Sequence, residues 1–448
     1  MFSIIIPTHN GEKSIEKTLN SMLEKLLYPT DEIILINDGS TDNTLEILYK
    51  YSKNPQIKII NQLNAGVSAA RNEGIRNLSK NSKFVTFVDD SDSLSENFFE
   101  EVLSFFNNHT NIDAISTPIK LFENNKYYDQ SLNYRFYTSN RIVNILKDFK
   151  DIQYHIGGMV FKSKVFTLNL YLFDEKVNYW EDAKLINMIF LDKKKYGLVS
   201  NAYYLYDRNE KSSLSKMAWK FQSRYAHHIV NNYTPLIKKS IQIYGKVIKY
   251  IQYLILNHYL NYMVEQNKKY IEYKHIKDNQ LFKLETFSLF KHIDIEIINE
   301  LNVPNSYKAI LYKLKGLEFP YYNYFKDIKC YIHKYSFKKS EILFSFSHNS
   351  YGLSEDAKVL NYKYNGRVVK ANVFQVKKLD VLGINIEDFS RKTFSINISL
   401  MQLLVGFNLV IIDENLSYPL KVKSSSLFNR LLKNINKKIM RFKLKKEK

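Results

Sequence analysis

The chain has 448 residues, 45% of them hydrophobic, and a formal net charge of +20. At roughly 150 residues per domain this length suggests about three domains, and the hydrophobic content is sufficient for a sizeable core. The single cysteine, Cys330, excludes an internal disulfide framework and fits a reducing compartment. The positive charge favours a polyanionic partner or an acidic membrane surface.

No signal peptide and no membrane span are expected. The first apolar segment begins at Phe2 without a basic region before it. The best candidate for a span, Val247 to Val264, is interrupted by Lys249, Gln252 and other polar residues. We therefore expect a cytoplasmic protein that is soluble or peripheral to the inner face of the cell membrane.

The first part of the chain alternates strands and helices. Apolar runs predict strands over Phe2–Pro7, Glu32–Asn37 and Gln56–Asn61, and from Phe84 onward. Helical spacing predicts helices after Asn10, after Asp42, over Ala65–Leu78 and over Ser95–Phe106. Such alternation is typical of an α/β fold whose mostly parallel sheet has flanking helices.

Polar residues follow the ends of the predicted strands. Asp38, Asn64 and the acids that begin at Asp89 all fall where a strand ends. Ligands of parallel sheets bind at the carboxyl ends of the strands. These side chains are therefore expected to converge at one edge of the sheet.

The acidic residues after the Phe84 strand are the most informative feature. Asp89, Asp90 and Asp92 would repel one another unless a cation shares them. Oxygen ligands suit a hard ion such as Mg²⁺ or Mn²⁺. A metal at a strand end indicates an enzyme that handles phosphate.

The later part of the chain changes character. Apolar residues from Ile241 onward follow helical spacing, and from Glu341 the period shortens to that of strands, as in Ile342–Ser347, Val368–Val376 and Thr393–Leu400. The expected domains are 1–230, the α/β domain; 231–330, a helical region; 331–426, a small β-rich module; and 427–448, a basic tail.

The tail has the pattern of an amphipathic helix. Apolar residues from Leu427 to Phe442 share one helical face, and nine Lys and Arg residues accompany them. Such a helix can lie in an anionic membrane interface. A helix docked on the protein with a frayed lysine end is the alternative.

Four motifs in order resemble those of glycosyltransferase family 2. They are Ile4-Ile-Ile-Pro-Thr-His-Asn-Gly11, Ile36-Asn-Asp-Gly-Ser-Thr-Asp42, Asn64-Ala-Gly-Val-Ser-Ala-Ala-Arg-Asn72 and Phe87-Val-Asp-Asp-Ser-Asp92, and Tyr179-Trp-Glu-Asp-Ala183 resembles the family's Glu-Asp element. The resemblance covers roughly residues 1–215 and implies the GT-A fold. In outline, the whole chain is similar to some wall teichoic acid and capsule glycosyltransferases.

The resemblance implies a uridine nucleotide site. Asp38 would accept the N3–H of uracil, although a turn residue is the alternative. Pro7 and His9 would line the base pocket. Asn64 and Arg71 would contact the nucleotide, with the Arg71 guanidinium facing the pyrophosphate, unless it is a plain surface arginine.

The acidic motif departs from the family pattern Asp-x-Asp-Asp, because Ser91 stands at the usual ligand position. Either Asp90 and Asp92 together hold Mn²⁺ or Mg²⁺, or Asp92 holds it with help from Asp89 or Asp90. Weaker metal affinity is a further possibility.

Asp182 is the expected catalytic base, which would take the proton from an attacking acceptor hydroxyl. Glu181 is the alternative base and is otherwise expected to contact substrate. Gly157-Gly158 would let a sugar approach the backbone, or form a plain turn. Arg208, with the serines at 212, 213 and 215, would belong to a loop that closes over the pyrophosphate.

The expected function is that of an inverting, metal-dependent glycosyltransferase. It would move a sugar from a UDP-sugar to a hydroxyl of a cell-envelope glycan, a polyol-phosphate polymer or a lipid-linked acceptor. A protein that binds nucleotide-sugar or anionic polymer without catalysis is the alternative. No motif for nucleic-acid recognition is present, and the acidic strand end is a poor surface for it.

Overall fold

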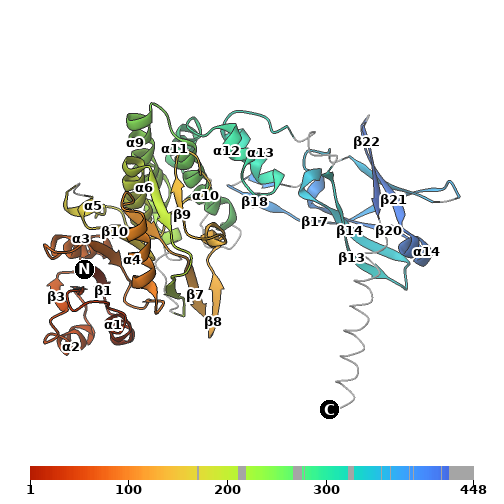
Figure 1. Cartoon of the computed structure of the whole chain (residues 1–448). Helices are drawn as coiled ribbons and strands as arrows, with labels where there is room; N and C mark the ends of the chain where they lie inside the picture. The colour runs from red at the N-terminus through yellow and green to blue at the C-terminus, as the bar shows by residue number, and fades with distance from the viewer. Residues whose placement is uncertain are drawn as a thin grey trace, which may run out of the picture. The chain divides into compact units, whose positions relative to one another are not determined.

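The computed structural model describes residues 1–168, 171–209, 218–265, 275, 276, 278–320, 327–354, 356–363, 365–382, 384–386, 388–414 and 416–422. The chain divides into two compact units (Figure 1). The first comprises Met1–Tyr259 and Asn279–Ile297, and the second comprises Leu260–Asp278 and Ile298–Lys448. The first unit thus runs past residue 230, the predicted end of the α/β domain. The predicted basic tail, 427–448, lies outside the described residues.

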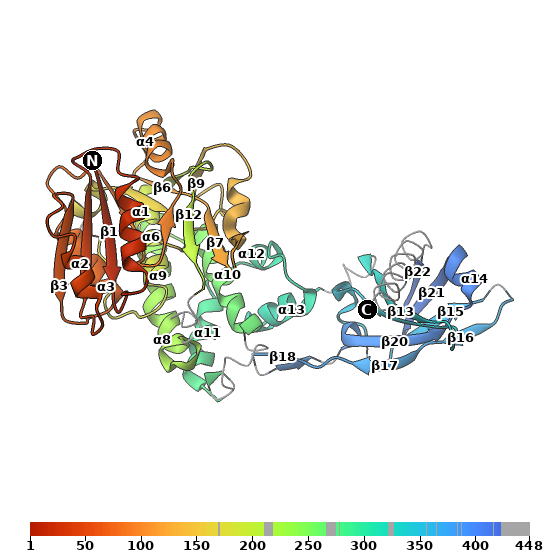
Figure 2. The same cartoon turned by 90° about the horizontal axis from the view of Figure 1, so that it is seen from below.

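The first four long strands form the parallel part of an eight-stranded sheet, in the order β3-β2-β1-β4. They are β1 (Phe2–Thr8), β2 (Glu32–Asp38), β3 (Ile57–Gln62) and β4 (Phe84–Phe87). In Figure 2 the first strands lie side by side in red. β1 and β2 are buried along their whole length, as expected for central strands covered on both faces. The predicted parallel α/β arrangement is confirmed.

The remaining strands make the sheet mixed. The order continues after β4 as β10-β6-β11-β9. These strands are β10 (Met159–Lys162), β6 (Ala114–Ser116), β11 (Lys195–Leu198) and β9 (Arg141–Asn144). β10 runs antiparallel to both β4 and β6. It therefore reverses the strand direction beside the predicted acidic site.

Helices cover both faces of the sheet. On one face, apolar residues of α1 (Ile15–Leu23), α2 (Thr44–Tyr49) and α4 (Phe98–Asn108) pack with Ile4 and Ile6 in one core. On the other face lies α3 (Val67–Arg76), where a Cβ at Gly74 would come within 2.5 Å of Ile5. This close approach seats the last turn of α3 on the middle of β1.

A smaller sheet and two further helices flank the main one. The smaller sheet has the strand order β5-β12-β7-β8. Its strands are β5 (Ser93–Leu94), β12 (Tyr204–Asp207), β7 (Ile119–Glu123) and β8 (Lys126–Asp129). The helices are α5 (Lys164–Thr167) and α6 (Glu181–Lys193). β5 follows the acidic residues directly, so this sheet fixes the far side of the acidic turn.

The predicted helical region is present. It contains α8 (Ala226–His228), the π-helical turn η4 (Ile229–Tyr233), α9 (Thr234–Tyr244), α10 (Lys249–Glu265), α11 (Gln280–Phe290), α12 (Ile295–Asn299) and α13 (Asn305–Leu314). Within the described residues, no helix is both long and apolar enough to cross a membrane.

The second unit carries the predicted β-rich module. One antiparallel sheet has the order β13-β14-β20-β17, formed by β13 (Cys330–Ser336), β14 (Glu341–Phe346), β20 (Lys392–Asn397) and β17 (Asn372–Val376). The other has the order β16-β15-β21-β22, formed by β16 (Val368–Lys370), β15 (Lys358–Tyr362), β21 (Phe407–Asp413) and β22 (Leu416–Val422). The module also contains a separate hairpin of β18 (Leu379–Val381) and β19 (Ile384–Ile386).

Two predicted strands of this module are shorter than expected. The run 368–376 breaks at Ala371, because β16 pairs in one sheet and β17 in the other. The run 393–400 ends at Asn397, because Ser399 forms a capping box with Gln402 and starts α14 (Leu400–Val405). Strand periodicity does not reveal either a change of sheet or a helix cap.

Candidate active site

The ends of β1 and β4 meet at the acidic turn. Thr8 Oγ1 donates a 2.6 Å hydrogen bond to Asp90 Oδ2, and Asp92 N donates to Asp89 O at 3.0 Å, which closes the turn. Gly11 leaves the space that this requires, since a Cβ there would come within 2.5 Å of Asp90 Oδ2. These contacts join the end of β1 to the acidic turn after β4.

Asp38 anchors the loop that precedes α3. Its Oδ1 accepts hydrogen bonds from Ala65 N at 2.8 Å and Gln62 Nε2 at 2.7 Å, and its Oδ2 accepts one from Gly66 N at 2.9 Å. Asp38 is buried. Asp38 therefore stabilises a turn, which is the alternative role considered for it above. Its Oδ2 has a second lone pair that can accept from another donor.

His9 and Asn64 lie together at the surface beside Asp38. His9 Nδ1 donates to Asp38 O at 2.8 Å, and Asn64 Nδ2 lies 3.3 Å from His9 Nε2. Gly39 adopts φ +65°, and a Cβ there would come within 2.6 Å of Asn64 N, so only glycine allows this approach. Pro7 is buried within β1, beyond the last residue that pairs with β4, where its missing N–H breaks no ladder bond.

Arg71 is not a surface arginine. Its side chain is 5% exposed, and its guanidinium donates from Nη2 to Asp89 Oδ1 and from Nη1 to Glu181 Oε1, both at 3.0 Å. Phe173 packs against the guanidinium, 5.3 Å from ring centre to Cζ. Burial alone would lower the pKa of Arg71, but the charges of Asp89 and Glu181 raise it above its usual value. Arg71 therefore links two acids from opposite sides of the site.

Asp92 is tied to protein groups. Its side chain is buried, its Oδ2 accepts a 2.6 Å hydrogen bond from Tyr204 Oη, and its Oδ1 accepts one from Asp207 N at 2.9 Å. Burial, with the charges of Asp89 and Asp90, raises the pKa of Asp92 well above its ordinary value. Asp90 and Asp89 are the more exposed carboxylates of the turn.

Asp182 stands at the start of α6 and points to a backbone amide. Its Oδ2 accepts a hydrogen bond from Ile156 N at 3.2 Å, and its Oδ1 accepts one from Ala183 N at 2.7 Å. Burial, and next the charge of Glu181, raises the pKa of Asp182 to about 7. Glu181 is the residue that pairs with Arg71. The two neighbouring acids therefore have different environments.

Two glycines and Arg208 were predicted on the substrate side. A Cβ at Gly157 would come within 2.9 Å of the Tyr204 ring, and one at Gly158, where φ is +76°, within 2.7 Å of Thr117 Oγ1. Protein packing alone therefore requires both glycines. Arg208 is exposed directly after β12, and its backbone N–H bonds to Phe122 O. The predicted serines at 212, 213 and 215 lie outside the described residues.

The acidic turn fits a divalent ion only in part. Among the described residues, no three His, Cys, Asp or Glu side chains are arranged to hold a metal ion. In nucleotide sites, however, Mg²⁺ is held by one or two carboxylates together with substrate phosphates and water. Asp90 and Asp89 are two such carboxylates; Asp90 accepts a hydrogen bond from Thr8, and Asp89 accepts one from Arg71.

Some residues of the site were not predicted from the sequence. Asn72 is buried beside Arg71; its Nδ2 donates to Phe173 O at 2.9 Å, and Phe173 N donates back to its Oδ1 at 2.8 Å. Tyr204 supports Asp92 from β12. In the sequence, the polar pair Arg71-Asn72 follows small residues in the same helix, and this pattern could have indicated that Asn72 belongs to the site.

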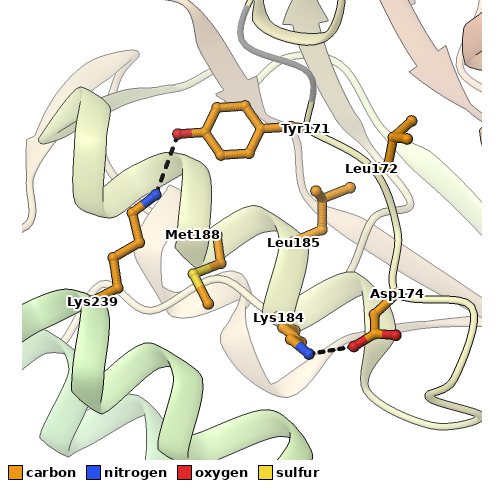
Figure 3. A pocket seen from close by; sticks show the side chains of 7 residues that line it. All are labelled: Tyr171, Leu172, Asp174, Lys184, Leu185, Met188 and Lys239. Carbon is orange, nitrogen blue, oxygen red and sulfur yellow. Dashed lines mark hydrogen bonds and ion pairs between the residues drawn. The ribbon is translucent and has the colours of Figure 1, made fainter.

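A cavity of about 220 Å³ is lined in part by residues of α6 (Figure 3). Lys184, Leu185 and Met188 of α6 line it, and Asp182 is not among the lining residues. The ammonium groups of the cavity are already paired, Lys184 with Asp174 and Lys239 with Asp192. Each lysine charge is therefore offset by a carboxylate, although Asp192 is not part of the lining.

The chain is similar to known proteins over most of its length. The family model described as "Glycosyl transferase family 2" matches residues 3–167. The chain is 31% identical over 454 residues to the minor teichoic acid biosynthesis protein GgaA of Bacillus subtilis, covering 98% of this chain and 100% of GgaA. It is 32% identical to GgaB of the same organism, over 57% of this chain and 28% of GgaB.

Solved structures share the fold. The crystal structure of S. aureus TarS superimposes with a TM-score of 0.56 at 16% identity, covering 94% of this chain and 77% of TarS. Residues 1–349 of TarS in complex with UDP-GlcNAc give a TM-score of 0.51 at 19% identity, covering 70% of this chain and 87% of that one. The predicted resemblance is confirmed: the chain belongs to glycosyltransferase family 2 and is a glycosyltransferase.

Proposed function

We propose that this glycosyltransferase moves a sugar from a UDP-sugar to a hydroxyl group of a cell-envelope glycan or polyol-phosphate polymer, with inversion at the anomeric carbon. The observation that carries the proposal is the environment of Asp182. A carboxylate with a pKa of about 7 is matched to taking a proton near neutral pH. The full-length similarity to GgaA, named for minor teichoic acid biosynthesis, supports an acceptor of this class.

Asp182 serves as the general base. As the acceptor oxygen bonds to the anomeric carbon, the bond from that carbon to the diphosphate oxygen breaks and UDP leaves. The acceptor proton passes to Asp182, whose orientation is fixed by Ile156 N and Ala183 N. A single displacement of this kind inverts the anomeric centre.

The donor occupies the edge formed by the ends of β1, β2 and β4. Uracil lies over His9 and bonds to the remaining lone pair of Asp38, with Asn64 at its rim. Asp90, assisted by Asp89, would hold Mn²⁺ or Mg²⁺; when bound, such an ion supplies positive charge to the leaving diphosphate. Arg208, which is exposed directly after β12, would close over the diphosphate.

Arg71 has a different role in this proposal from the one expected from sequence. Both of its terminal nitrogens are engaged by carboxylates, so it holds Asp89 and Glu181 at a fixed separation. It thereby sets the distance between the donor side and the base rather than contacting the pyrophosphate.

UDP release tests the proposal. Purified protein with Mn²⁺, a panel of UDP-sugars and a polyol-phosphate acceptor should release UDP, and Asp182→Asn should abolish release while UDP still binds. NMR of the product should show an inverted anomeric configuration. Binding of UDP-sugars without turnover of any of them would favour the non-catalytic alternative.

A further inference from the structure

The residue before the acid pair has an unusual backbone. Trp180 adopts φ 67° and ψ 19°, the left-handed region, and its side chain is 5% exposed. A bulky residue keeps such a conformation only where its surroundings enforce it, and such positions cluster at functional sites. Trp180 is the N-cap of α6, so its backbone conformation sets the direction in which α6 begins and in which the side chains of Glu181 and Asp182 point.

Aromatic side chains from three helical segments surround Trp180. The His258 ring, from α10, stacks on it at 4.8 Å and 25°. The Tyr233 ring, from η4, meets it edge-on at 5.3 Å and 82°, and the His228 ring, from α8, lies at 5.6 Å. These are the favoured arrangements of aromatic pairs. The indole is thus held from several directions.

His258 is itself held in one orientation. Arg224 Nη2 lies 3.4 Å from His258 Nε2, and Tyr233 Oη hydrogen-bonds to His258 Nδ1. A guanidinium N–H can only donate, so Nε2 accepts and Nδ1 carries the proton that is donated to Tyr233. Burial, and then the charge of Arg224, lowers the pKa of His258 well below its usual value, which keeps the ring neutral.

Asn232 holds the backbone next to Trp180. Its Nδ2 donates to Tyr179 O at 3.2 Å and to His228 Nδ1 at 2.9 Å. Asn232 lies in the π-helical turn η4, a rare geometry that is frequent at functional sites. One side chain thus ties the helical segment to the peptide that enters the strained position.

We propose that Asn232 and His258 are positioning residues for the catalytic base: they hold the Tyr179–Trp180 backbone so that Asp182 faces Ile156 N and the acceptor hydroxyl. The inference rests on the proposed function, because it assumes that Asp182 takes the proton. Neither residue touches the reacting atoms. Each acts through the backbone or the ring of Trp180.

The test uses full-length Asn232→Ala, His258→Gln and His258→Phe, with His227→Ala as the matched control. His227 lies on the same helix as His228 but is exposed. We expect each of the three variants to lower kcat at least tenfold, to leave the affinity for UDP within twofold, and to shift the acid limb of the pH–rate profile. His258→Phe keeps an aromatic ring for stacking and should lose less than His258→Gln. The control should match the wild type.

Two results would overturn the proposal: unchanged kcat in all three variants, or a loss of UDP affinity that parallels the loss of kcat. The latter would indicate general loosening of the fold. If His258 variants do not fold, Asn232→Ala, which removes only two hydrogen bonds, decides. The Asp182→Asn variant separates the two proposals. If Asp182→Asn is active, Asp182 is not the base. If Asp182→Asn is inactive while the Asn232 and His258 variants are fully active, only the positioning role is refuted.

Discussion

The guanidinium of Arg71 donates from Nη1 to Glu181 Oε1 across 3.0 Å, although the two residues lie 110 positions apart in the chain. The other terminal nitrogen of Arg71 bonds to Asp89. One buried cation therefore joins α3, the acidic turn after β4 and the first turn of α6. The donor side and the proposed base are connected by this single side chain.

Replacing Arg71 should lower stability more than it lowers nucleotide affinity. Arg71→Met leaves Glu181 buried without a counter-charge, and breaking a buried pair costs about 3 kcal/mol or more. Arg71→Lys should be nearly as harmful, because one ammonium group cannot reproduce the planar fork that reaches both carboxylates. Thermal unfolding and UDP titration calorimetry measure the two effects.

The double variant Arg71→Met with Glu181→Gln is the control. Removing both charges should recover part of the lost stability, since no unpaired charge remains. If Arg71→Met instead kept full stability and lost UDP affinity, the arginine would be a pyrophosphate ligand, as the sequence resemblance implied.

The pH–rate profile should rise through about pH 7. Because the pKa of Asp182 is raised to about 7, the base is protonated and inactive below that pH and ionised above it. Asp182→Asn should remove this limb and lower kcat by about 10² to 10⁴-fold. A profile already flat from pH 5 upward would exclude Asp182 as the group that titrates.

Stability gives an independent measurement of the same group. A carboxyl whose pKa is raised on folding binds its proton more tightly in the native state, so its contribution is present at low pH and is lost as pH rises towards 7. Asp182→Asn should therefore raise the melting temperature relative to wild type at pH 8 and change it little at pH 4. Equal effects at both pH values would contradict the raised pKa.

The sequence predicted the strand ends well and the partners of individual side chains poorly. Asp38, Asp90 and Asp182 fall at element ends that periodicity and motif order identify. By contrast, the bridge from Arg71 to Glu181 joins residues that are distant in sequence, so no local pattern contains it. The same holds for the stacking of His258 on Trp180, which depends on tertiary packing of a helical segment without a recognised motif.

The basic tail should bind anionic membranes. The sequence has nine Lys and Arg residues from Arg430 to Lys448, and each one near an anionic surface contributes about 1 kcal/mol. In a flotation assay at low salt, the full-length protein should rise with phosphatidylglycerol vesicles. It should not rise with neutral vesicles. Deletion of residues 427–448 should abolish flotation and leave UDP release in solution unchanged. Equal flotation of the deleted protein would place the membrane contact elsewhere.

Asp90 and Asp92 should differ when each is changed to asparagine. Asp90 is half-exposed with one oxygen on Thr8, so Asp90→Asn should weaken UDP binding at least tenfold with Mn²⁺ and hardly at all without it. Asp92→Asn should mainly lower stability, by about 1–3 kcal/mol, because asparagine has a single acceptor oxygen and cannot accept from both Tyr204 Oη and Asp207 N. Adding Tyr204→Phe to Asp92→Asn should restore part of it. The opposite pattern, with manganese dependence lost only in Asp92→Asn, would make Asp92 the ligand despite its burial.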